Sequence, residues 1–259
     1  MFKRAAILIV SCALFGAGCA SRPATVPMPT RFDAGACPAA TDTLLVLLPG
    51  ARSPIDEFER EGFVDAMRER GLAVDVVRAD AHRGYYDASL AVVQRLREDV
   101  IAPAQARGYR SIWIAGISLG GLGGALYAQA HPADVAGLVL IAPYLGERAA
   151  ATEIDNAGGL VNWQAPTGPL QPPQQTAREF RDPALWRWLQ TRAAQPQDAG
   201  SPPLYLGYGR EDRFAFNHRL LGAALPAARV ATTAGGQDWP AWRRLWQSLL
   251  STLPLPRCG

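Results

Sequence analysis

The chain has 259 residues, of which 49% are hydrophobic and 19% charged, with a formal net charge of +3. That length and hydrophobic content suit one globular α/β domain with a sizeable core, and the composition, with seven Trp, excludes a disordered chain. The three histidines form no Cys/His cluster with metal-ligand spacing, so we predict neither a metal site nor a cofactor.

The N-terminus has the pattern of an export signal. Lys3 and Arg4 precede an apolar run, Ala5–Phe15, which is too short for a comfortable membrane span, and small residues lead to Cys19. We predict a signal peptide over residues 1–18. The pattern also resembles a bacterial lipoprotein signal in which Cys19 becomes the acylated first residue, although Gly16 stands where such signals usually have Leu. A plain cleaved signal peptide is the alternative.

The predicted export of the chain affects the expected net charge, the role of residues 19–40 and the state of the cysteines. Loss of residues 1–18 would remove Lys3 and Arg4 and no acidic residue, which lowers the formal charge from +3 to +1. The chain is therefore not expected to bind nucleic acid. Residues 19–40 are predicted to be a lipid-anchored or flexible tether, and the domain to lie on the periplasmic side of a bacterial membrane. In an oxidising compartment the two remaining thiols, Cys37 and Cys258, are expected to form a disulfide, although two free thiols in mobile tails are the alternative.

Short apolar runs alternate with helix-like segments through residues 41–259, which predicts a mostly parallel sheet covered on both faces by helices. The expected strands are Thr43–Leu48, Leu72–Arg78, Ser111–Gly116, Ala136–Ala142, Leu204–Tyr208 and Arg229–Thr233. The expected helices are Ser53–Arg70, Asp87–Arg107, Leu119–Ala130, Phe214–Leu225 and Trp239–Leu250.

Particular residues predict the start of the first helix, a kink in the second helix and an insertion late in the chain. Ser53 is expected to cap its helix in a capping box with Asp56, and Pro103 to kink the second helix. Residues 144–200 interrupt the alternation of strands and helices. We predict that they form a small cap with one helix near Asp182–Arg192. An insertion there would lie over the carboxyl ends of the strands, where open α/β sheets bind ligands.

A glycine-rich motif follows the third expected strand. Gly116-Ile117-Ser118-Leu119-Gly120 leads directly from that strand into a helix, as a nucleophile elbow requires. The turn holds Ser118 in a strained conformation, and Gly116 and Gly120 provide the space that it needs. An ordinary glycine-rich turn is the alternative, but the strand and helix on either side favour a nucleophilic serine.

Acyl transfer also needs an oxyanion hole and an acid. The amide of Leu119 is the expected first donor, and the amide of Ala51, with Arg52 as the alternative, the expected second. Asp212, in the loop after the strand at 204–208, is the expected acid. Its neighbour Glu211 could take that role instead, and Asp212 could also merely cap the following helix.

Together, the strand followed by Leu-Pro-Gly, the Gly-Ile-Ser-Leu-Gly elbow, the loop aspartate and the closing Gly-Gly-x-Asp-Trp-Pro segment resemble the α/β-hydrolase family of esterases and lipases over about Thr43–Leu253. The resemblance implies hydrolysis or transfer of acyl groups through an acyl-serine intermediate. It also implies a histidine in the loop after the last strand, where this chain has Gln237. Glutamine cannot take up a proton near neutral pH, so it cannot be the general base for Ser118.

Another histidine would have to supply the base. His82 and, less strongly, His218 are candidates, whereas His131 lies at the far end of the helix that begins after Ser118. Three functions therefore remain open. The first is an exported, lipid-anchored hydrolase of small carboxylic esters; the second is a catalytically impaired relative that binds a ligand or an envelope partner; the third is an acyltransferase. The oligomeric state is not predicted.

Overall fold

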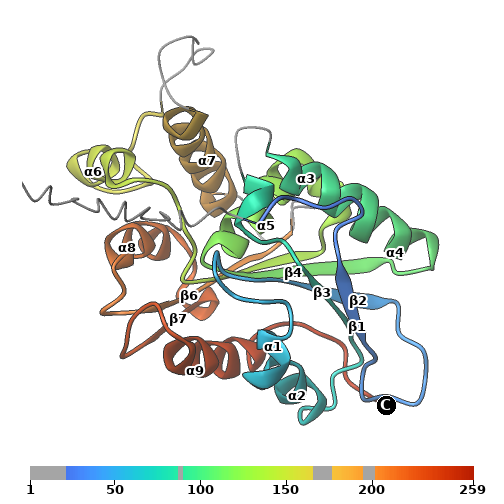
Figure 1. Ribbon diagram of the computed structural model, residues 1–259. Helices are drawn as coiled ribbons and strands as arrows, with labels where there is room; N and C mark the ends of the chain where they lie inside the picture. Colours follow the sequence, from blue (N-terminus) through green and yellow to red (C-terminus); the bar gives the residue numbers. More distant parts are fainter. Residues whose placement is uncertain (1–21, 87–89, 166–176, 195–201) are drawn as a thin grey trace, which may run out of the picture.

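The computed structural model describes residues 22–86, 90–165, 177–194 and 202–259, with side chains in the third range described only from Pro183 onward. It contains a seven-stranded sheet with the order β1-β3-β2-β4-β5-β6-β7 (Figure 1). All neighbouring strands pair in parallel except β1 and β3. The predicted fold class, a mostly parallel sheet flanked by helices, is confirmed.

Five of the six predicted strands lie within two residues of their expected bounds, and the β3 strand starts three residues late. The observed strands are β1 (Thr30–Asp33), β2 (Thr43–Leu48), β3 (Asp75–Ala79), β4 (Ser111–Ile117), β5 (Gly137–Ile141), β6 (Leu204–Gly209) and β7 (Val230–Thr233). Every residue of β2, β5 and β6 is buried, as expected for strands covered on both faces. In the register of the parallel pairs, Leu48 stands beside Gly116 and Ile117 beside Ile141, so these strands end at one edge.

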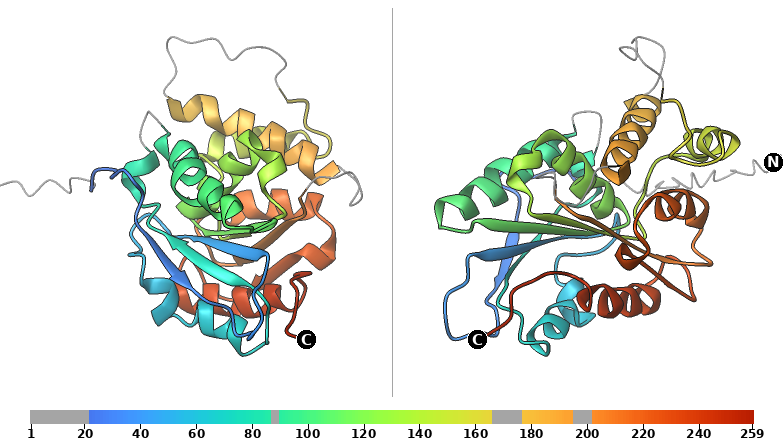
Figure 2. Two further views of the ribbon diagram at one scale, coloured as in Figure 1. Left: turned by 90° about the vertical axis from the view of Figure 1, so that its right-hand side faces the viewer. Right: turned by 180° about the vertical axis from the view of Figure 1, so that it is seen from behind.

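Helices cover both faces of the sheet (Figure 2), and their apolar side chains form two core layers. One is formed by α3 (Ala91–Arg95), η2 (Leu96–Ile101), α4 (Ala102–Ala106), α5 (Leu119–Ala130) and α8 (Ala215–Ala224), and the other by α1 (Glu57–Arg60), α2 (Phe63–Arg68) and α9 (Trp239–Leu250). The predicted bounds of α5 and α9 agree with the structure. Short 3-10 turns, η1 (Arg83–Tyr86), η3 (Pro132–Asp134) and η4 (Ala227–Arg229), join several elements.

Two helix predictions need correction. The helix predicted over 53–70 is two short helices, because Gly62 between them adopts a left-handed conformation with φ of 74°. Helix α1 begins only at Glu57, and Asp56 makes no side-chain capping bond, so the predicted capping box is wrong. The helix predicted over 87–107, part of which lies outside the described residues, consists from residue 91 onward of α3, η2 and α4, and Pro103 lies in the first turn of α4. The irregular part is the π-helical segment η2 that precedes it.

The expected tether is largely part of the folded domain. Within residues 22–40, β1 pairs antiparallel with β3 at the edge of the sheet. Arg22 forms an ion pair with Asp80 at 2.6 Å, and the side chain of Met28 is buried in the core. The residues from 22 to 40 are therefore not a flexible tether. Residues 19–21 lie outside the described residues.

The insertion between β5 and β6 carries two helices where one was predicted. Helix α6 (Arg148–Asn156) was not foreseen, whereas α7 (Ala177–Ala194) covers the expected Asp182–Arg192. Both pack on α8, and α7 also contacts α5. Trp163 and Trp186 are buried in the core, so these rings support the insertion itself.

Cys37 and Cys258 form a disulfide, as the sequence analysis predicted. The bond closes a loop of 221 residues and joins the segment before β2 to the C-terminal tail. That tail is also held by the amide of Cys258, which donates to the carbonyl oxygen of Gly71. Among the described residues, no helix combines the length and apolar character needed to cross a bilayer.

Candidate active site

Ser118 lies in a strained turn between β4 and α5. Its φ of 53° and ψ of −112° place it in a backbone region that residues with a side chain rarely adopt. A Cβ on Gly116 would collide with the backbone of Gly120, and a Cβ on Gly120 with the carbonyl of Leu48. The two motif glycines therefore permit the turn, as the sequence pattern predicted, and Ser118 is presented at the N-terminus of a twelve-residue helix.

Gln237 contacts the nucleophile directly. It follows β7, and its Nε2 donates a hydrogen bond to Oγ of Ser118 at 2.8 Å. The same nitrogen also lies 3.3 Å from the carbonyl oxygen of Ala142, which it donates to. Gln237 is the residue at which the sequence resemblance implies a catalytic histidine. The amide is a donor to Ser118, however, and a base would have to be an acceptor of its proton.

The residues that follow β5 lie next to Ser118 and Gln237. Ala142 has a φ of 46° and is one of only three non-glycine residues with positive φ among those described. The amide of Ser118 donates to the carbonyl of Ile141, and the amide of Tyr144 donates to the carbonyl of Ser118, both at 2.9 Å. Gln237 thus bridges two strained residues, Ser118 and Ala142. Sequence reasoning missed Ala142; its place directly after a buried strand at the carboxyl edge of the sheet was the available signal.

Asp212 is buried, with 5% of its surface exposed, in the loop between β6 and α8. Its Oδ1 accepts the amide of Phe214 at 2.7 Å, so it supports the start of α8. Its Oδ2 is buried and has no hydrogen-bond partner among the described residues. Burial raises the pKa of this carboxyl, and Asp238 adds to the rise, while the Phe214 amide and Arg213 oppose it. The N-cap of α8 is Phe214 and the helix has no side-chain capping bond, so Asp212 does not cap it.

The alternative acid, Glu211, is used elsewhere. Its side-chain carboxylate accepts the amide of Gly235, and its own amide donates to the carbonyl of Gly235. Glu211 therefore ties the loop after β6 to the loop that carries Gln237. Asp212, whose Oδ2 is free, remains the candidate acid.

The loop after β2 runs beside the nucleophile. A Cβ added to Gly50 would lie 3.8 Å from Cβ of Ser118, so the next amide, that of Ala51, is close to the elbow. Leu119 begins α5, where an amide has no acceptor within the helix. These two positions suit the predicted oxyanion donors. The side chain of Arg52 is exposed, and its amide is one residue farther along the loop.

Neither substitute histidine contacts Ser118 in the described part of the chain. Nδ1 of His82 accepts the amide of Gly84, and its ring packs on Tyr85; burial, with Arg22, lowers the pKa of His82, while Asp80 opposes that change. His218, on α8, is fully buried with Nε2 at 2.8 Å from the carbonyl oxygen of Pro143.

The environment of His218 keeps it neutral. Burial lowers its pKa to about 4, and the hydrogen bond to Pro143 opposes that shift only in part. Because a carbonyl can only accept, the proton of the neutral ring is on Nε2. His218 therefore holds the segment after β5 and does not act on Ser118. His131 ends α5, remote from the elbow.

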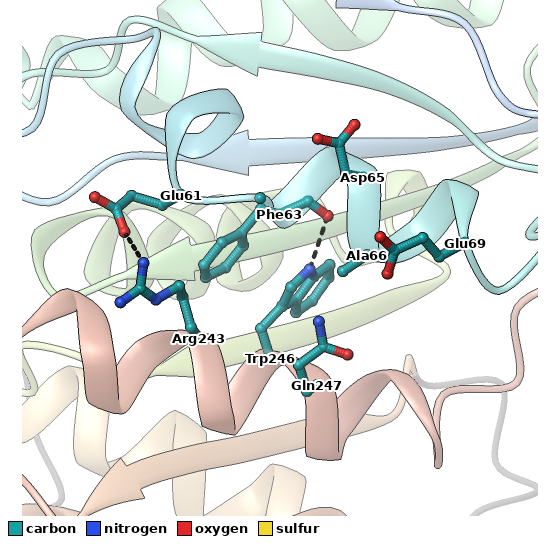
Figure 3. A pocket seen from close by; sticks show the side chains of 9 residues that line it. Glu61, Phe63, Asp65, Ala66, Glu69, Arg243, Trp246 and Gln247 are labelled. Carbon is teal, nitrogen blue, oxygen red and sulfur yellow. Dashed lines mark hydrogen bonds and ion pairs between the residues drawn. The ribbon is translucent and has the colours of Figure 1, made fainter.

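A groove elsewhere on the surface is separate from this site. It has a volume of about 260 Å³ and lies between α2 and α9 (Figure 3). Figure 3 shows that Arg243 reaches Glu61 across it and that the indole of Trp246 donates to the carbonyl of Phe63. Its lining includes neither Ser118 nor Gln237. Within the described ranges, no group of three or more His, Cys, Asp and Glu side chains is arranged to hold a metal ion.

The fold and the strained serine elbow are those of an α/β hydrolase. The profile of the serine aminopeptidase S33 family matches residues 40–214, and the chain belongs to this hydrolase family. Among curated proteins, none matches the sequence significantly.

Solved structures of hydrolases share the fold. A hydrolase from Pseudomonas aeruginosa PA01 is 18% identical with a TM-score of 0.54, covering 87% of this chain and 93% of its own. Est1E from Butyrivibrio proteoclasticus, solved with ferulic acid, is 15% identical with a TM-score of 0.54 and coverages of 86% and 94%. An S-formylglutathione hydrolase from Staphylococcus aureus is 15% identical with a TM-score of 0.51 and coverages of 81% and 80%. At these identities the likeness shows the fold alone.

Proposed function

We propose that this protein is an exported serine hydrolase that acts on small carboxylic esters through an acyl-Ser118 intermediate, without a resident histidine base. The observation that carries the proposal is the strained elbow, which holds Ser118 at the start of α5 and close to Gly50, so that the amides of Leu119 and Ala51 are the expected oxyanion donors. Such amides stabilise the negative charge that develops on an acyl oxygen, a contribution worth about 3–4 kcal/mol per donor.

The chemistry follows from what Gln237 can and cannot do. When Oγ of Ser118 attacks the acyl carbon, a C–O bond forms and the hydroxyl proton passes to solvent, because the Gln237 amide has no basic site. The ester C–O bond then breaks, and the leaving alkoxide or aryloxide keeps the bonding electrons and takes a proton from water. Esters whose leaving group is stable as an anion, such as aryl esters, therefore react faster than alkyl esters. Hydrolysis of the acyl-serine lacks a base as well and is expected to be slow.

A specific observation favours a second candidate function. The hydrogen bond from Gln237 occupies a lone pair of Ser118 Oγ and makes the serine less nucleophilic. A relative of the hydrolases that binds a carbonyl- or carboxylate-bearing ligand or an envelope partner at this site, without turning it over, fits that arrangement. An acyltransferase would use the same acyl-serine and differ only in the acceptor.

Reaction with a fluorophosphonate probe separates these functions. The purified chain lacking residues 1–18 is incubated with the probe and analysed by intact mass, with Ser118→Ala as the matched control. The hydrolase proposal predicts slow, stoichiometric labelling that Ser118→Ala abolishes, together with slow turnover of short-chain aryl esters. No labelling and no turnover would leave the binding function. A rise in transesterified product upon adding an alcohol would indicate acyl transfer.

The localisation is a further part of the proposal. Acylation of Cys19 would anchor the domain on the periplasmic side of a bacterial membrane, only three residues before Arg22, the first residue that the structure describes. The full-length chain expressed in a bacterial host should fractionate with membranes, and Cys19→Ser should move it to the soluble fraction. An unchanged distribution in that variant would overturn the lipid anchor but not the hydrolase proposal.

A further inference from the structure

Two buried oxygen atoms in adjacent loops have no hydrogen-bond donor in the described structure. One is Oε1 of Gln237 and the other is Oδ2 of Asp212. Buried polar atoms are almost always paired, because an unpaired one costs about 1–3 kcal/mol. Since a carboxylate and an amide oxygen can only accept, these two atoms need a proton between them or a donor from elsewhere.

The topology brings the two side chains to one place. Gln237 follows β7, yet its Nε2 reaches Ser118 and Ala142, which follow β4 and β5. In the sheet β6 lies between β5 and β7, so the Gln237 side chain crosses above the end of β6. Asp212 sits in the turn after β6, where its amide donates to the carbonyl of Gly209.

The orientation of the Gln237 amide is fixed on its other side. The atom beside Ser118 also lies 3.3 Å from the carbonyl oxygen of Ala142, which can only accept. An oxygen in that position would face the carbonyl without a proton, so the nitrogen belongs there. Oε1 consequently points away from Ser118 and Ala142.

We propose that Asp212 is protonated in the folded protein and donates a hydrogen bond from Oδ2 to Oε1 of Gln237. This bond holds the amide with its NH2 group toward Ser118, so Asp212 is a positioning residue that acts through Gln237. In a triad the acid is ionised and accepts from histidine; here it is a neutral donor. The inference concerns the site of the proposed function, and its catalytic meaning rests on that function.

The charges around Asp212 act in both directions. Arg213, the Phe214 amide and the N-terminus of α8 favour the carboxylate, whereas Asp238 at the start of α9 and burial disfavour it. Glu211, on the same loop, is paired with Gly235, and His218 on α8 is neutral. The side chain of Arg213 lies over the Phe214 ring, 4.6 Å from its centroid, and forms no ion pair with Asp212 in the described part of the chain. Burial is the largest of these effects.

The test is the pH dependence of unfolding of Asp212→Asn against the wild type. Asparagine matches the neutral acid, since its oxygen accepts the Phe214 amide and its NH2 donates to Gln237. A carboxyl with a raised pKa binds its proton more tightly in the folded state. The wild type should therefore lose stability relative to the variant as pH rises above about 4, by about tenfold in the unfolding constant per pH unit until the folded-state pKa is passed.

The expected result at pH 7 is an unfolding temperature for Asp212→Asn equal to or above that of the wild type, and a lower one for Asp212→Ala. A relative stability that is flat or rises with pH would overturn the proposal. That result would indicate an ionised Asp212, with a reversed amide or a buried water as its donor. Isotope-edited infrared spectra of the wild type at pH 7 should contain a protonated-carboxyl band. Absence of that band would overturn the proposal even if Asp212→Asn does not fold.

A second experiment combines Asp212→Asn with Gln237→His, a variant that contains a base beside Ser118. In Gln237→His an ionised Asp212 is required to orient the imidazole, so adding Asp212→Asn should reduce ester turnover by about 10⁴-fold. The unfolding and infrared measurements contain no ester, so they decide the state of Asp212 whether or not Ser118 hydrolyses anything. Failure of this inference and failure of the proposed function are thus distinguishable.

Discussion

Replacing Gln237 by histidine should create ester hydrolysis at Ser118. The Nε2 atoms of the two side chains are separated from Cα by the same number of bonds, so the imidazole nitrogen should reach the position now 2.8 Å from Oγ. Nδ1–H would then face Oδ2 of Asp212, which is buried without a described partner and, once ionised beside an imidazole, accepts that hydrogen bond. In a serine protease the base alone is worth about 10⁶-fold in turnover. A misplacement of 1 Å costs about 10²-fold, so we expect a gain of about 10⁴-fold.

Turnover of a short-chain aryl ester, measured with purified wild type and variant, tests this expectation. Gln237→Ala is the matched control, because it removes the hydrogen bond to Ser118 without adding a base. Gln237→His combined with Ser118→Ala shows that any gain passes through the serine. A variant that is folded by circular dichroism and no faster than Gln237→Ala would refute the reasoning. It would mean that Asp212 or the oxyanion donors are wrongly assigned.

Three further predictions concern the fold around the site. Gly120→Ala should yield little folded protein, measured by soluble expression and circular dichroism, because its Cβ would collide with the backbone at the end of β2; normal yield would contradict that contact. Cys258→Ser should lower the free energy of unfolding by roughly 2–5 kcal/mol in denaturant titrations, since the Cys37–Cys258 bond closes most of the chain; an unchanged value would show that the bond contributes nothing. Burial lowers the pKa of His218 to about 4, so its contribution to the free energy of unfolding is present above about pH 6.5 and is lost as pH falls toward 4. His218→Asn should lack that loss. Identical profiles of unfolding free energy against pH for the variant and the wild type would refute the assignment.

Periodicity and turn chemistry were sufficient for the central part of the fold. Continuous apolar runs marked the buried strands, and the predicted bounds of α5 and α9 are those of the structure. The short edge strand β1 has no such signal, because three of its four residues are polar and its residues are only partly buried or exposed. Its strand conformation depends on pairing with β3, a tertiary contact that local sequence does not encode.

In the candidate site, too, local sequence patterns could be predicted and contacts with distant segments could not. The elbow and the loop aspartate are local patterns, and the position of Gln237 follows from its place after the last strand. The surroundings of His82 and His218 were not predictable, because each depends on contacts with distant segments. His218, for example, is held by the carbonyl of Pro143, which lies 75 residues away in the sequence.

The geometry at Ser118 argues against a site that is merely a remnant. Ser118 and Ala142 both hold positive φ values, and strain of this kind costs about 1–3 kcal/mol per residue. Gln237 contacts both residues, so its amide stabilises the strained arrangement as well as the serine side chain. The Gln237 side chain reaches as far as a histidine would, but its amide donates to Ser118 and cannot take up a proton. The substitution therefore changes which proton transfers the site can perform and leaves the presentation of Ser118 intact, as both a slow acyl-serine hydrolase and a ligand-binding relative require.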